Sequence, residues 1–168
     1  MTSPPSRTIS AHGITLRLRP GWDANIRLPS AAAIDAPPSL RTDQVIPIGG
    51  TTNAMLHAAT VPLGVVVADY GGGVVERLGR TDAFVAVVGF DPEAASTELF
   101  RRTGVPRLTD RSFRPEVQQR VLPNASGAQV FFQVAGRPFC LYVVVGNHAL
   151  RHRTVARVNQ LLGGLTIT

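Results

Sequence analysis

The chain has 168 residues, a length typical of one domain, and its 44% of hydrophobic residues suffices for a core without disulfides or a structural metal. Only 17% of the residues are charged, which argues against a disordered chain. The formal net charge is +6, and all 17 basic residues are arginine, a bias that is typical of a GC-rich bacterial genome.

The compartment can also be predicted from the sequence. Cys140 is the only cysteine, so no internal disulfide can form, as expected in a reducing compartment. The residues up to Gly13 lack the apolar run of a secretory signal. The longest apolar stretches, Val61–Ala68 and Ala83–Val88, are too short to cross a bilayer. We therefore predict a cytoplasmic protein without a membrane span.

The N-terminal part of the chain predicts a tail followed by two strands. Residues 1–12 are rich in Ser and Pro, which predicts a flexible tail. Apolar residues alternate with polar ones over 14–18, as in a half-buried strand, until Pro20 and Gly21 break the pattern. We expect 24–28 to form the partner of this strand.

The central part mixes irregular and strongly apolar segments. Residues 29–50 contain several Pro and Gly clusters and predict a long irregular excursion. A strand is expected over 54–61, and the glycine run 71–73 predicts a flexible turn leading into a short helix. Residues 83–90 are almost wholly apolar, which is typical of a central strand covered on both faces. The sequence Asp-Pro-Glu at the start of 91–102 predicts a capped helix over that range.

The C-terminal third carries the clearest pattern. Residues 115–122 fit either a short helix or a strand. Apolar residues alternate through 128–145 on both sides of a central turn, which predicts a β-hairpin. Asn147 is expected to cap a helix whose apolar stripe extends over 150–162. A short last strand is predicted at 165–167.

This order of elements favours an α+β fold: a mostly antiparallel sheet with helices packed on it, in one domain over 13–168. The tripeptide Pro20-Gly21-Trp22 after the opening strand, the hairpin, and the closing helix and strand resemble the PsbP-like family. The resemblance implies an α/β/α sandwich that is non-catalytic and binds other macromolecules. We expect no photosynthetic role, because the targeting segments of the photosynthetic members have no counterpart here.

Charge is distributed unevenly along the chain. All 11 acidic residues lie at or before Glu116, whereas 117–168 contain five arginines and no acid. Two of these arginines are expected near the first turn of the last helix, where the helix dipole and free amide groups also attract anions. A solvated basic face is the alternative interpretation. The candidate contacts to an anion or a partner are Arg151, Arg153, Arg157, His148 and His152.

No catalytic, cofactor-binding or metal-binding motif is predicted. The glycine run at 71–73 lacks the spacing of a dinucleotide fingerprint. The two histidines four residues apart in the last helix are flanked by arginines, which would repel a cation. Cys140 is expected in mid-strand as a small buried hydrophobe. Asp69 and Tyr70, beside the glycine run, are the polar pair that most suggests a cleft.

We therefore predict a non-catalytic protein-interaction or assembly module that binds another protein or a second copy of the chain, without a cofactor. One alternative is a binder of nucleic acid or another polyanion through the basic C-terminal third, which the isoelectric point of about 11.2 favours. The other alternative is a small-ligand carrier or an unrecognised enzyme with an open cleft near Tyr70 or the long loop.

Overall fold

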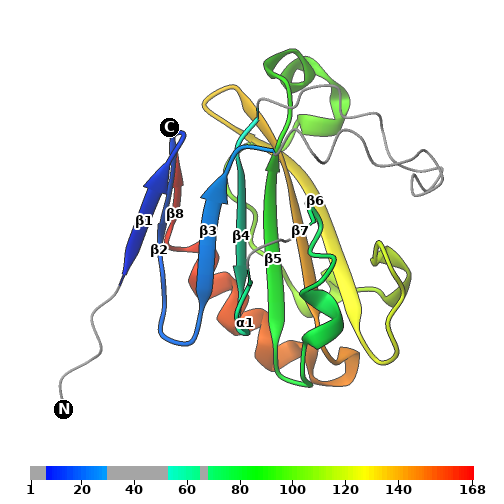
Figure 1. Ribbon diagram of the computed structural model, residues 1–168. Helices are drawn as coiled ribbons and strands as arrows, with labels where there is room; N and C mark the ends of the chain where they lie inside the picture. The colour runs from blue at the N-terminus through cyan, green and yellow to red at the C-terminus, as the bar shows by residue number, and fades with distance from the viewer. Residues whose placement is uncertain (1–6, 30–52, 65–67) are drawn as a thin grey trace.

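The computed structural model describes residues 7–29, 53–64 and 68–168, and two antiparallel sheets and one α-helix are found among them (Figure 1). The strands are β1 (Thr8–Ala11), β2 (Ile14–Arg17), β3 (Asp23–Arg27), β4 (Met55–Ala59), β5 (Ala83–Gly89), β6 (Ser126–Val134), β7 (Arg137–Val145) and β8 (Leu165–Ile167). The helical segments are α1 (Arg151–Leu162) and the 3-10 helices η3 (Val75–Arg77), η4 (Pro92–Ser96), η5 (Glu98–Phe100), η6 (Asp110–Ser112), η7 (Pro115–Val117) and η8 (His148–Leu150). The fold is therefore α+β.

The larger sheet has the strand order β3-β4-β5-β7-β6, and all neighbouring strands are antiparallel. Its central strand β5 is buried along its whole length, because side chains on both faces of the sheet are covered. Successive residues of a strand point to opposite faces. Val85 and Val87 accordingly belong to one core cluster, and Phe84 and Ala86 belong to the other.

The smaller sheet, β1-β2-β8, closes one side of the molecule. Strand β2 pairs with both β1 and β8, so it joins the two ends of the described chain. Helix α1 lies behind the larger sheet in the view of Figure 1. Its apolar residues Val155, Val158 and Leu161 pack in the same core cluster as Ile14 and the first face of β5.

The second face of the larger sheet is covered differently. In the described part of the chain, its core cluster is completed by 3-10 segments and loops and by no α-helix. This cluster contains Leu63, Val74, Val75, Phe90, Phe100 and Ala125 from the covering segments, with Phe84, Cys140, Tyr142 and Val144 from the strands. Loops that cover an apolar sheet this way leave room for a cavity between them.

Most strands that the sequence predicts are confirmed. Strands β2, β4, β5 and β8 and the β6–β7 hairpin lie where the patterns place them. Asn147 caps the C-terminal helical region, since its side chain accepts the N–H of Leu150 at 3.2 Å. The cap begins the 3-10 helix η8, and α1 starts at Arg151.

Two predictions about the N-terminal region are wrong. The flexible tail was expected over 1–12, but 8–11 form strand β1, because the tight turn at His12 and Gly13 folds this segment back onto β2. Strand β3 pairs with β4 and not with the opening strand β2. Residues 1–6 and most of the predicted excursion at 29–50 lie outside the described residues.

The helix predicted over 91–102 is also wrong, because this segment forms η4 and η5, separated by the extended residue Thr97. Asp91 caps nothing with its side chain and instead accepts a hydrogen bond from Asn53 Nδ2 at 2.8 Å. The Gln133 amide donates to carbonyls at Ala95 and Phe100, 3.1 and 2.8 Å away. Hydrogen bonds from the distant Gln133 thus take the place of the backbone hydrogen bonds that an α-helix would make here. On the second face of the larger sheet, 3-10 segments and loops of the described chain lie where the expected sandwich has a layer of helices.

Candidate functional site

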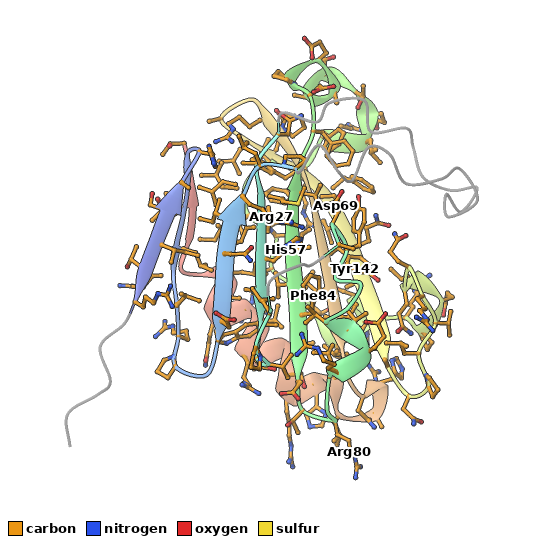
Figure 2. All side chains as sticks on the ribbon, in the orientation of Figure 1. Arg27, His57, Asp69, Arg80, Phe84 and Tyr142 are labelled. Atoms are coloured by element: carbon orange, nitrogen blue, oxygen red, sulfur yellow. The ribbon has the colours of Figure 1, made fainter. Side chains whose placement is uncertain are left out.

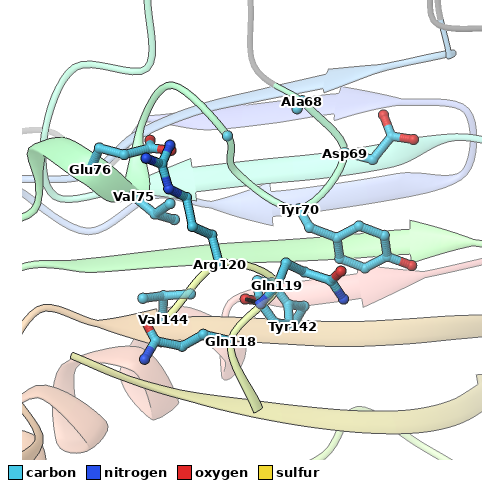
Figure 3. Close-up of a pocket in the computed structure, with 11 residues that line it drawn as sticks. Ala68, Asp69, Tyr70, Val75, Glu76, Gln118, Gln119, Arg120, Tyr142 and Val144 are labelled. Atoms are coloured by element: carbon cyan, nitrogen blue, oxygen red, sulfur yellow. Dashed lines mark hydrogen bonds and ion pairs between the residues drawn. The ribbon is translucent and has the colours of Figure 1, made fainter. Parts of the chain in front are cut away.

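A cavity of about 440 Å³ opens on the second face of the larger sheet (Figure 3). It lies between the loop that carries Asp69 and Tyr70 and the loop that carries 118–120, over strand β7. Small-molecule sites in proteins typically have volumes of about 300–1,000 Å³. The lining residues are Ala68, Asp69, Tyr70, Gly72, Val75, Glu76, Gln118, Gln119, Arg120, Tyr142 and Val144.

The first wall is a tight loop held by glycine. Gly71 has φ +89°, and a Cβ at this position would lie 2.6 Å from the Phe84 ring, so the backbone rests directly on that ring. The carbonyl of Gly71 accepts the N–H groups of Val74 and Val75 at 2.9 and 3.0 Å. These contacts fix the position of the neighbouring Tyr70 at the cavity.

The second wall is held by Gln118, which is buried. Its amide nitrogen donates to carbonyls at Pro115 and Ala125, 2.9 and 3.1 Å away, and its oxygen accepts the Leu122 N–H at 3.3 Å. The side-chain amide of Gln118 therefore makes its hydrogen bonds to backbone groups around its own loop. The next N–H, of Gln119, donates to the Tyr142 hydroxyl at 2.8 Å and ties this loop to the sheet.

The floor of the cavity is apolar and aromatic. Tyr142 is 1% exposed, and its ring meets that of Tyr70 edge to face with centroids 5.4 Å apart. Burial raises the pKa of both phenols, so they remain neutral hydroxyl groups around pH 7. Val75 and Val144 complete the apolar surface.

Charged residues lie at the rim. The Arg120 guanidinium lies 3.5 Å from the Glu76 carboxylate, and the arginine side chain is 74% exposed. A solvated ion pair of this kind contributes little to stability. Because the two residues come from opposite walls, they connect the walls at the mouth of the cavity.

A buried histidine supports the first wall from below. His57 on β4 is fully buried, and its Nε2 lies 2.8 Å from the carbonyl oxygen of Asp69. A carbonyl only accepts hydrogen bonds, so Nε2 carries the proton and Nδ1 is left without a partner among the described residues. Burial lowers the pKa of His57 to about 4, with a smaller contribution from the nearby Arg27 charge (Figure 2).

This pKa predicts a pH-dependent stability. An unfolded histidine titrates near 6.5, so the unfolded chain binds more protons than the folded chain between pH 4 and pH 6.5. The free energy of unfolding should therefore fall by up to about 3 kcal/mol as the pH decreases through this window. Urea titrations of the wild type and the His57→Gln variant at several pH values measure the effect. The free energy of unfolding of the wild type, relative to that of the variant, should increase as the pH rises from 4 to 6.5. If the free energies of the two proteins change with pH in parallel, the prediction is contradicted.

The structure places the polar pair Asp69 and Tyr70, singled out in the sequence, at the cavity. The five candidate contacts of the last helix are not gathered at one place. Arg151 donates to the carbonyls of Asp110 and His148, at 3.0 and 2.7 Å, whereas Arg157 donates to the carbonyl of Thr81 at 3.0 Å. Positions 151 and 157 also differ by about 240° around a helix of 3.6 residues per turn.

The remaining candidates occupy different surroundings. His152 and Arg153 are exposed on α1, and His148 is half-buried in η8. Cys140 is buried on the sheet as expected, and burial raises its thiol pKa to about 12. Within the described ranges, no group of three or more His, Cys, Asp or Glu side chains could hold a metal ion. No helix in the described part of the chain combines the length and apolar character needed to span a bilayer.

Sequence reasoning missed most of the cavity. Gln118, Gln119 and Arg120 lie in a segment without a periodic pattern, so no local signal marks them. The hairpin pattern did contain a usable signal, because alternation puts Tyr142 and Val144 on one face. It could not show that loops far apart in the sequence meet over that face.

The comparisons with known proteins match no family model, no curated protein and no solved structure. The resemblance to the PsbP-like family therefore stays a prediction.

Proposed function

We propose that the chain binds a small, mostly apolar ligand in the cavity over Tyr142. The observation that carries this proposal is the combination of a cavity of about 440 Å³ with a buried aromatic and aliphatic floor and a polar rim. Ligand sites are typically concave and apolar, with a few polar groups that orient the ligand. Here the phenol of Tyr70 and the exposed amide of Gln119 can serve that purpose, together with the guanidinium nitrogens of Arg120 that do not face Glu76.

Binding is favoured over catalysis by the kinds of residue at the cavity. Among the described residues, the lining contains no histidine, cysteine or serine, so these residues do not supply the nucleophile and base that acyl transfer requires. His57 contacts the wall from beneath, through the Asp69 carbonyl, and does not line the cavity. The two phenols are neutral hydrogen-bonding groups, which suit a ligand carrying a hydroxyl or carbonyl group.

A fragment titration tests the proposal. Indole, phenol and hexanol are added to the wild type, to Ala68→Trp and to Val121→Trp, and binding is followed by ligand-observed NMR and the shift in Tm. Ala68 lines the cavity, whereas Val121 is 69% exposed and does not line it. We expect saturable binding of at least one fragment in the wild type, lost in Ala68→Trp because an indole ring narrows the cavity, and kept in Val121→Trp. Equal binding by all three proteins, or no binding by the wild type, would contradict the proposal.

Two finer statements also remain proposals. The first is the PsbP-like α/β/α sandwich in a cytoplasmic protein. It is supported by helix α1, which packs against one face of the larger sheet, and by the 3-10 segments, which pack against the other face.

The second finer statement is that the chain is a protein-interaction module. In the described part of the chain, the exposed large apolar residues are Leu28, Leu99 and Val121, and they come from three separate segments. The small-ligand proposal therefore has the stronger support.

A further inference from the structure

Arg157 lies between two turns at one end of the molecule. Its Nη1 donates to the carbonyl of Thr81 at 3.0 Å, in the loop before β5. On its other side, a Cβ at Gly21 would lie 4.0 Å from its Nη2, so the guanidinium is next to the turn between β2 and β3. The half-buried Arg157 thus bonds to the turn before β5 and lies next to the turn between β2 and β3.

Further arginines extend from the same two turns and from the same flank of α1. Arg19 begins the turn that closes with the Trp22 N–H to Arg19 carbonyl hydrogen bond, and Arg80 directly precedes Thr81. Arg153 lies one helical turn before Arg157. All three are exposed, and Figure 2 shows Arg80 extending away from the ribbon at this end. We name the set Arg19, Arg80, Arg153 and Arg157 the arginine ridge.

The acids nearest to the ridge are occupied by internal hydrogen bonds. Asp82 accepts the Thr60 hydroxyl and the Gly79 N–H, both at 2.8 Å, and Asp23 accepts the Leu63 N–H at 2.9 Å. In the described part of the chain, no ion pair joins an arginine of the ridge to a carboxylate. These guanidiniums therefore keep most of their donors for a partner.

We propose that the arginine ridge binds the phosphate backbone of nucleic acid without sequence preference, as a function separate from the cavity. Arginine side chains are common donors to the phosphate backbone, and such contacts carry no sequence information directly. The core of a protein–protein interface is instead typically more apolar than the remaining surface and depleted in charged residues. Leu28, Leu99 and Val121, the exposed large apolar residues of the described chain, are not part of the ridge.

The ridge differs from the site expected at the start of the last helix. There, the Arg151 guanidinium is held by two backbone carbonyls, and the Leu150 amide is capped by Asn147. Arg153 and Arg157 come from the basic C-terminal third, but Arg19 and Arg80 come from the first half of the chain. The tertiary structure brings them together.

The test measures binding of a short fluorescein-labelled DNA duplex by anisotropy at increasing salt. Four phosphate contacts predict a salt slope of about −3.6, which is a roughly 100-fold loss of affinity between 50 and 200 mM salt. Replacing two ridge residues, in Arg19→Gln/Arg80→Gln, should reduce that loss to about 10-fold and weaken binding at low salt. Neither side chain makes a hydrogen bond within the described part of the chain, so the variant should stay folded, and a measurement of its Tm verifies this.

The control is Arg101→Gln/Arg102→Gln, which removes the same formal charge at the other end of the sheet. It also breaks the exposed Arg101–Glu98 ion pair, and such solvated pairs contribute little to stability. Thr103, next to these residues, bridges Gln133 near the hairpin turn, whereas Thr81 lies before the start of β5. The control should retain the wild-type salt slope. The proposal is overturned if both double variants lose affinity equally, if the wild type shows no salt-dependent binding, or if the wild type binds polyglutamate and not the duplex.

Discussion

Gly71→Ala is expected to lower the free energy of unfolding by about 2–5 kcal/mol. About 1–2 kcal/mol comes from forcing an L-residue to adopt φ +89°. A further 1–3 kcal/mol, roughly, comes from overpacking, because the new Cβ would lie 2.6 Å from the Phe84 ring. The Phe84 side chain is fully buried, so it has little room to move. The loop carrying Tyr70 must shift, and the cavity should lose its fragment ligands as well.

Gly104→Ala is the matched control for this prediction. Gly104 has φ +83°, and no atom lies within 4 Å of a Cβ built there. This variant therefore has the backbone cost without the clash and should lose only about 1–2 kcal/mol. Urea denaturation of both variants, followed by fluorescence and circular dichroism, measures the difference. Equal losses would show that contact with Phe84 does not hold the loop in place.

Phe84→Ala is expected to lower the free energy of unfolding by about 3–5 kcal/mol, a large part of the 5–15 kcal/mol typical of a domain. Phe84 lies on the central strand β5, is fully buried, and has its ring centroid 5.6 Å from that of His57. Its removal leaves a cavity beneath Gly71 and His57. Val121→Ala, at a residue 69% exposed, should change stability by less than about 0.5 kcal/mol.

A double-mutant cycle connects the two largest predictions. If the Phe84 ring is what the new methyl group meets, Gly71→Ala should cost less in the Phe84→Ala background than in the wild type. The residual cost should approach that of Gly104→Ala, because only the backbone conformation would then be penalised. If the losses of unfolding free energy in the two single variants simply add up in the double variant, the cost of Gly71→Ala does not come from contact with the Phe84 ring.

Several elements were predictable because their information is local. The sequence predicts β5 as a central strand because nearly all of its residues are apolar. In the structure every residue of β5 is buried. The β6–β7 hairpin follows from its alternating apolar residues. The sequence predicts its turn at 136–138, and the structure places it at Ala135 and Gly136, both at positive φ. The apolar stripe of α1 repeats at helical spacing and is buried.

Other elements were decided by contacts with distant segments. Pairing of β3 with β4 depends on residues separated by a long stretch of chain, and local alternation does not specify a partner. The capping pattern at Asp91 predicted a helix, but Gln133 binds the carbonyls of this segment and favours two 3-10 helices. Local propensities are weak, and tertiary hydrogen bonds and burial override them.

The sequence by itself determined the α+β class, the central strand, the hairpin and the closing helix, because each follows from a periodicity within one segment. It also marked Asp69 and Tyr70, beside a glycine run, as a candidate cleft. Only the tertiary structure brought Gln118 to Arg120 over Tyr142, and brought the turns that carry Arg19 and Arg80 next to Arg157. The physical reason is that a cavity or a charged surface is built from side chains on separate loops, whose meeting depends on how the whole core packs.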